Sequence, residues 1–185
     1  MYNAVLSKKI FDQLMNGRIV NKTIIGNSDA FVENPLFTEI IDNLADYRQQ
    51  YKMAGYDFVE NAQYFYIRDR ASDKNELKTD ITMKACVLLL LMGKYLTENN
   101  YRISKLTDPN GGLLEADFEA IQDMPDTAEI LEKSGMKRSF SQSVDITLVE
   151  RNIMLQKTSS NAFILSDSGR AFFDEIIDSY QVSIS

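Results

Sequence analysis

The sequence YDFVENAQYFYIR, residues 56–68, decides the fold of the first half of the chain. Two runs rich in aromatic and β-branched residues flank the polar segment Glu60–Gln63, which is the pattern of a β-hairpin. Upstream, Ser7–Gly17 has apolar residues at helical spacing and ends at a glycine that suits a helix C-terminus. Helices followed by a β-hairpin have the element order of a winged-helix domain.

A second, longer helix is predicted between these two elements. Asn34 is a candidate N-cap, Pro35 suits the first turn, and Gly55 marks the end. One apolar stripe runs along its whole length and consists of Phe37, Ile40, Ile41, Leu44, Tyr47 and Tyr51. We therefore expect one continuous helix that packs on the hairpin.

The second half repeats this plan with different residues. IMLQKTSSNAFIL, residues 153–165, predicts a second hairpin, and Ser139–Asn152 predicts a helix directly before it. Ser166 is expected to cap a last helix. The buried stripe of that helix consists of Phe172, Phe173, Ile176, Ile177 and Tyr180. The predicted fold class is α+β, predominantly helical, with two tandem winged-helix domains.

A charged stretch, Arg68–Thr79, separates the two halves and has the composition of a domain boundary. We place the N-terminal winged-helix domain at residues 1–74 and the C-terminal one at residues 75–185. Asp80 is expected to cap a long helix over Ile81–Glu98. That helix is apolar almost all round its middle, so it should lie at the centre of a core.

The composition lacks the residues that most enzymes and metal sites need. There is no histidine, and Cys86 is the single cysteine, so neither a disulfide nor a Cys/His zinc site is possible within the chain. Gly111-Gly112 lacks the Lys-Ser/Thr continuation of a phosphate loop, and no serine lies in a Gly-x-Ser-x-Gly motif. We expect no enzymatic activity, no cofactor and no metal.

The sequence shows no signal for export or for membrane insertion. Met1–Lys9 has no apolar core of the length that a secretory signal requires. The longest apolar run, Ala85–Met92, is far shorter than the roughly 20 residues that span a bilayer. We expect a cytoplasmic protein that does not associate with membranes.

The net charge of −7 argues against a free-standing DNA-binding domain, because phosphate contacts supply most of the affinity for DNA. A winged helix places its last helix in the major groove and basic residues of its wing on phosphate. The candidate DNA contacts by this rule are Arg68, Arg70, Lys137, Arg138, Arg151 and Lys157. Asp145 and Glu150 on the helix before the second wing would repel phosphate, so we expect DNA contact that is weak or that occurs within a larger complex.

The aromatic strand of the first hairpin is a candidate surface for a protein partner. Its side chains alternate between two faces, so either Tyr64 and Tyr66, or Phe65, should remain partly exposed. Exposed aromatic side chains are frequent anchors of protein interfaces. The alternative is that all three serve only the core.

Several short strings resemble a known family in order and spacing. They are Asn16–Ile19, Asp29–Phe31, the helix with Leu44, Tyr47 and Tyr51, Tyr64–Arg70, Phe163–Ser166 and Gly169–Phe173. The chain resembles the kleisin-interacting subunits of bacterial condensins, MukE and especially its shorter MksE-type relatives. The resemblance implies a non-catalytic accessory subunit that dimerises and binds the kleisin. Through the kleisin it would sit on the SMC-type ATPase, associated with the nucleoid, and assist chromosome condensation and segregation.

Two other functions stay open. A winged-helix transcriptional regulator would bind duplex DNA as a dimer, with strong salt dependence. Relatives of the MukE type also serve plasmid-defence versions of the same complex, and the resemblance covers these equally.

Overall fold

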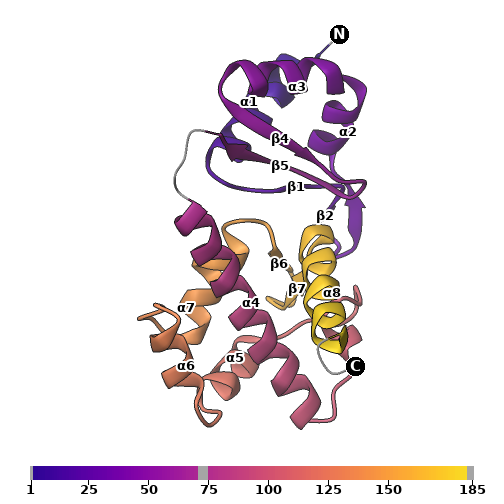
Figure 1. The fold of residues 1–185 in the computed structure, drawn as a ribbon. Coiled ribbons are helices and arrows are strands. Elements are labelled where there is room, and N and C mark those ends of the chain that lie inside the picture. Colours follow the sequence, from indigo (N-terminus) through magenta and orange to yellow (C-terminus); the bar gives the residue numbers. More distant parts are fainter. Residues whose placement is uncertain (1, 71–74, 183–185) are drawn as a thin grey trace.

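A computed structural model describes the backbone of residues 2–70 and 75–182, which form two units placed one above the other (Figure 1). The N-terminal unit contains residues 2–70. Its elements are α1 (Ala4–Met15), β1 (Val20–Asn21), β2 (Thr23–Ile25), β3 (Phe31–Glu33), α2 (Pro35–Asp42), α3 (Leu44–Met53), β4 (Tyr56–Glu60) and β5 (Tyr64–Asp69).

Helices α1, α2 and α3 cover one face of a sheet with the strand order β1-β5-β4, and the other face of this sheet is turned toward the C-terminal unit (Figure 1). In this antiparallel sheet Phe65 pairs with Val20 and with Glu60. The hairpin was predicted from its two apolar runs, and this prediction is confirmed. Its core residues under the helices are Ile10, Leu14, Val20, Leu36, Phe37, Ile40, Tyr47, Tyr51 and Phe65.

The prediction of one continuous helix before the hairpin is wrong, because the chain breaks at Asn43 between α2 and α3. The Asn43 side-chain amide donates to the backbone oxygen of Glu39 at 3.2 Å and to its Oε1 at 3.1 Å. Such a side-chain bond competes with the helical ladder, and the Asn43 backbone leaves the helical region at φ −127°. Ile41, counted in the predicted stripe, is therefore half exposed. The predicted cap is confirmed, since the Asn34 side chain accepts from the Leu36 amide.

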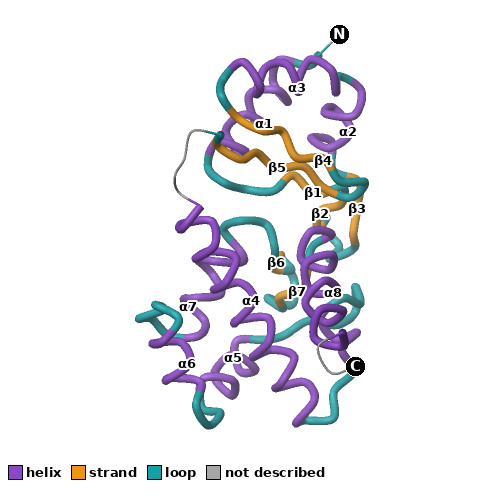
Figure 2. The backbone as a smooth tube through the Cα atoms, viewed as in Figure 1, coloured by secondary structure: helices purple, strands orange, loops and turns teal. Residues whose placement is uncertain are grey.

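The C-terminal unit contains residues 75–182. Its elements are α4 (Asn75–Glu98), the 3₁₀ turn η1 (Ile103–Leu106), α5 (Glu115–Gln122), α6 (Thr127–Lys133), α7 (Phe140–Val144), the π-helical turn η2 (Asp145–Val149), β6 (Met154–Gln156), β7 (Phe163–Leu165) and α8 (Asp167–Val182). Helix α4 runs through the middle of this unit, and Figure 2 shows the β6–β7 hairpin near its junction with the N-terminal unit. Leu88, Leu89 and Met92 of α4 are fully buried, as expected for a central helix.

Of the two caps predicted for the long helices, the one of α8 is confirmed and the one of α4 is wrong. Ser166 caps α8 as predicted, because its Oγ accepts from the Gly169 amide at 3.1 Å. Asp80 does not cap α4, because the helix already begins at Asn75. Gly169 lets α8 approach the second hairpin closely, since a Cβ there would lie 2.1 Å from the carbonyl oxygen of Ile153.

The buried apolar side chains form two separate clusters, one in each unit. The cluster of the C-terminal unit includes Phe173, while Phe172, Ile176 and Ile177 pack against it. The side chain of Tyr180, the last member of the predicted stripe, lies outside the described residues. The predicted boundary at residues 74 and 75 adjoins residues 71–74, which also lie outside them. Two cores agree with two domains, and the division at this boundary remains our proposal.

Candidate functional site

The two units are joined along one side by a polar seam, which we define as Asn21, Thr23 and Asp29 with their partners in the C-terminal unit. Asn21 is 2% exposed. Its amide donates to the Asn152 carbonyl oxygen at 2.8 Å, and its Oδ1 accepts from the Ser168 amide at 2.9 Å. Thr23 donates from its backbone and its hydroxyl to Asp167 Oδ2, at 2.7 and 2.8 Å.

Asp29 completes the polar seam at the turn of the second hairpin. Its carboxylate accepts from the amides of Thr158 at 2.8 Å and Ser159 at 3.2 Å, and from the Ser159 hydroxyl. The Ser159 hydroxyl, aided by these amides, holds the pKa of Asp29 below its usual value of 3.8. Asp29 has φ +57°, a conformation that Asp and Asn tolerate better than other side chains do. The polar seam therefore fixes how the two units sit relative to each other.

Beside the polar seam the units separate and enclose a cleft of about 900 Å³. The outer face of β5 forms one wall, and residues 81–86 of α4 together with α8 form the other. The charged, aromatic and larger apolar residues that line this cleft include Arg18, Tyr64, Tyr66, Ile67, Arg68, Ile81, Met83, Cys86, Arg151, Phe172 and Glu175. Residues predicted separately as DNA contacts, Arg68 and Arg151, thus share one cavity with two predicted partner contacts, Tyr64 and Tyr66.

The side chains of β5 alternate between the two faces of the sheet, and this determines which of its aromatic residues is buried in the core. Phe65 is 2% exposed in the N-terminal core, so it is unavailable to a partner. Tyr64 and Tyr66 lie on the opposite face, half-buried, with their ring centroids 6.2 Å apart. Burial, followed by the neighbouring Tyr66 and Glu175, raises the pKa of Tyr64. Of the alternatives left by the sequence, the structure therefore presents the two tyrosines and not the phenylalanine.

The cleft carries positive charge that the described residues do not neutralise. Among the described residues it is lined by the guanidinium groups of Arg18, Arg68 and Arg151 and by one carboxylate, Glu175. Within residues 2–70 and 81–178 none of these three arginines forms an ion pair. The Nε of Arg151 is buried and has no hydrogen-bond acceptor. Gly17, at φ +72°, makes room for this guanidinium, since a Cβ there would lie 3.0 Å from its Nη1.

The apolar wall of the cleft could not be recognised from the sequence. Cys86 belongs to the apolar run of α4, and Ile81 and Met83 lie in the turn before that run. Phe172 was assigned to the stripe that packs α8 on the core. Met83 is 45% exposed. Burial, followed by the charge of Glu175, raises the pKa of the Cys86 thiol, so this thiol is protonated at neutral pH. No local pattern distinguishes these residues from core residues, because only the packing of α4 and α8 under the sheet brings them together.

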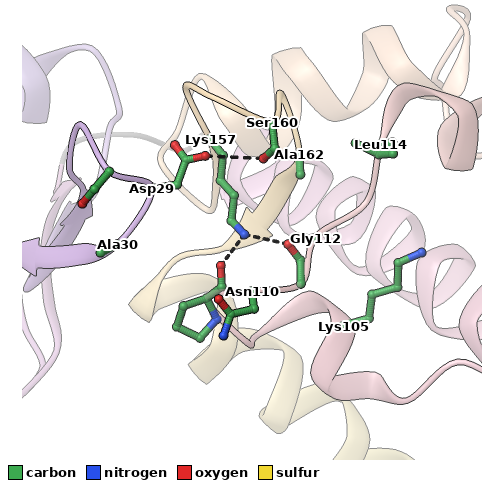
Figure 3. A pocket seen from close by; sticks show the side chains of 12 residues that line it. Asp29, Ala30, Lys105, Asn110, Gly112, Leu114, Lys157, Ser160 and Ala162 are labelled. Carbon is green, nitrogen blue, oxygen red and sulfur yellow. Dashed lines mark hydrogen bonds between the residues drawn. The ribbon is translucent and has the colours of Figure 1, made fainter.

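The other basic candidates lie outside the cleft. Arg70 pairs with Asp57, with 2.6 Å from its Nε to Oδ1, and Lys137 and Arg138 are exposed between α6 and α7. Lys157 is only 5% exposed, and its ammonium donates to the carbonyl oxygens of Pro109 and Gly111 (Figure 3). It stabilises the loop before Gly112, so it offers no exposed ammonium group to DNA phosphate. The burial of this wing lysine was not predicted.

A second hollow, of about 550 Å³, lies between the turn of Asp29 and this loop (Figure 3). Its cations are already satisfied: Lys157 by two carbonyl groups, and Lys105 by Asp117 at 3.3 Å and by the ring of Tyr101 at 3.9 Å. The cleft instead has half-buried aromatic rings and arginines that form no ion pair with the part of the chain that the structure describes. We therefore consider the cleft, and not this hollow, the candidate functional site.

Neither cavity assembles groups for metal chemistry. Within the described part of the chain, no three acidic or cysteine side chains converge closely enough to bind a metal ion. In that same part, each helix is too short or too polar to cross a bilayer. The cleft is suited to binding, since its groups are aromatic rings, apolar side chains and fixed charges.

Comparison with known proteins gives one clear result. No curated protein matches the chain. A family model described as "Condensin complex protein MksE" matches residues 5–177, which cover both units and the whole cleft. The chain belongs to the MksE family of condensin complex proteins.

Proposed function

We propose that this protein is a non-catalytic accessory subunit of a bacterial condensin-like SMC–kleisin complex, and that it binds the kleisin in the cleft between its two units. Family membership supports the complex. The single observation that carries the binding site is the combination of half-buried Tyr64 and Tyr66 with three arginines that have no ionic partner among the described residues. A surface with unsatisfied charge and exposed aromatic rings is typical of an interface that a partner completes.

We also propose that each unit is a winged-helix domain. In the N-terminal unit, α1, α2 and α3 precede the β4–β5 hairpin, and in the C-terminal unit α5 to α7 precede β6–β7. In this interpretation the cleft lies between the first wing and the second domain. The wings then serve a protein partner, which agrees with the net charge of −7.

Through the kleisin the subunit would associate with the SMC-type ATPase in the cytoplasm, at the nucleoid, and assist chromosome condensation and segregation. Exposed basic residues such as Lys137 and Arg138 are candidates for DNA contact inside that complex. We further propose a homodimer, which the apolar side chains exposed on α1 support: Val5, Phe11 and Met15 are 66%, 44% and 41% exposed.

Titration calorimetry with the middle region of the kleisin from the same organism tests this function. We expect a dissociation constant of about 1 μM or lower, as for an interface of standard size. A 20-base-pair DNA duplex, titrated under the same conditions, should bind far more weakly. Tight, salt-sensitive binding of the duplex without binding of the kleisin would contradict the proposal and favour a transcriptional regulator.

A further inference from the structure

We infer that the cleft is built for an extended polypeptide segment of mixed charge, whose acidic side chains face the arginines and whose basic side chain faces Glu175. The inference rests on the proposed function, and it specifies the chemistry of the segment that the cleft takes.

The charge distribution gives the first argument. The whole chain carries a net charge of −7, yet the described lining of the cleft combines three guanidinium groups with one carboxylate. Arg18 and Arg68 are exposed, and Arg151 is half-buried with an unsatisfied Nε. A guanidinium group without an ionic partner can form charge-assisted hydrogen bonds with a carboxylate, so an acidic side chain of a bound segment would complete these arginines.

The spacing of the two tyrosines gives the second argument. Tyr64 and Tyr66 project from one face of β5, and their ring centroids are 6.2 Å apart. Side chains on one face of an extended chain recur at about 6.6 Å, twice the rise per residue of a strand. An extended segment can therefore place alternate side chains against successive rings. Strand β5 lies between β1 and β4, so around Tyr64 its side chains, and not its backbone, are available for recognition.

Glu175 gives the third argument, because its carboxylate favours a polypeptide over a nucleic acid as the ligand of the cleft. Basic groups beside aromatic rings also suit single-stranded DNA, whose bases stack and whose phosphates pair with arginine. A phosphate backbone carries negative charge at every nucleotide and would meet the carboxylate of Glu175 in the same cleft. A polypeptide can place lysine or arginine opposite Glu175 and acids opposite the arginines.

Selection from a phage-displayed library of random 12-residue peptides on the immobilised full-length chain tests the inference. We expect the selected peptides to be enriched in Asp and Glu together with apolar residues, and to share one basic position. Arg68→Gln should reduce the acidic enrichment, because Arg18 and Arg151 remain, and Glu175→Gln should remove the enrichment of the basic position. Both side chains are exposed, so both variants should fold. Arg102→Gln, an exposed arginine outside the cleft, is the matched control and should select as the parent chain does.

A synthetic peptide from the wild-type selection should bind Arg68→Gln about tenfold more weakly and should compete with the kleisin fragment. Peptides without charge preference, or equal selection by all variants, would overturn the inference. Binding of the oligonucleotide dT15 that Arg68→Gln weakens would overturn it in favour of nucleic acid. Kleisin binding that no cleft variant weakens leaves the proposed partner but refutes this site. Mixed-charge selection without kleisin binding supports the site and refutes the proposed partner.

Discussion

The polar seam and the cleft are two parts of one interface between the same two units. They differ in how many of their polar and charged side chains have a partner within the chain. At the polar seam Asn21, Thr23 and Asp29 direct donors and acceptors at Asn152, Ser159, Asp167 and Ser168. In the cleft the aromatic rings are half-exposed, and among the described residues the arginines have no ionic partner. The polar seam is complete without a partner, whereas the cleft is not.

From this difference we expect residues of the polar seam to stabilise the fold and residues of the cleft to bind the partner. Asn21 of the polar seam is buried and paired, so its loss leaves a partner unsatisfied and costs folding free energy. Exposed rings and unpaired arginines cost little when they are removed from the free protein, and their loss should appear in binding. Each substitution below tests whether this separation holds.

Two adjacent phenylalanines of α8 provide the largest expected contrast. Phe173 is 3% exposed in the core, within reach of Gly93, while Phe172 lines the cleft. Phe173→Ala should lower the free energy of unfolding by about 3–5 kcal/mol, because it leaves a cavity. Phe172→Ala should cost under about 2 kcal/mol and should weaken kleisin binding. Urea denaturation compares the two, and equal destabilisation would mean that α8 is placed wrongly.

Asn21→Leu tests the polar seam directly. The substitution keeps the size of the side chain but removes the acceptor of the Ser168 amide, and it leaves the Asn152 carbonyl with only the Ser168 hydroxyl at 3.4 Å. We expect the free energy of unfolding to fall by about 2–4 kcal/mol. Asn27→Leu, at an exposed asparagine of the nearby turn, is the control and should change it by less than about 0.5 kcal/mol. If the free energy of unfolding falls by the same small amount in both variants, the polar seam does not hold the units together.

Tyr66→Ala tests the cleft. The ring contacts Tyr64 but belongs to neither core cluster, so the stability should change by less than about 1 kcal/mol. The dissociation constant for the kleisin fragment should rise tenfold or more, as for an aromatic anchor of an interface. Tyr2→Ala is the matched control, since Tyr2 is 59% exposed and outside the cleft. Unchanged affinity in calorimetry would place the kleisin elsewhere.

Asp29 gives the smallest expected effect, through pH. Because its pKa in the folded protein lies below the usual 3.8, the contacts of its carboxylate add stability that is fully present above this value. That contribution is lost as the pH falls through the lowered pKa. Asp29→Asn should therefore be less stable than the parent chain at pH 6, and the difference should shrink below about pH 4. Urea denaturation at several pH values measures it, and a difference independent of pH would contradict the role of the charge.

The sequence predicted what depends on local patterns. Alternation and turn chemistry placed both hairpins, and the apolar run of α4 indicated a central helix. The break at Asn43 was missed because a side-chain amide overrides an unbroken apolar stripe. Lys157 was expected on the surface, but two carbonyl groups of a loop nearly 50 residues earlier bury it. The cleft was only half predicted: Tyr64, Tyr66, Arg68 and Arg151 were singled out, while its second wall arises from packing between distant helices.

The most direct test of the central claim needs no substitution. Cys86 is the only cysteine of the chain and lines the cleft, so its reaction with a thiol reagent reports whether the cleft is occupied. The rate of modification by 5,5′-dithiobis(2-nitrobenzoate) should be measured with and without a saturating kleisin fragment, at a mildly alkaline pH that increases the thiolate fraction of Cys86. The account predicts that the bound fragment slows the reaction at least tenfold. An unchanged rate with the kleisin fully bound would contradict it.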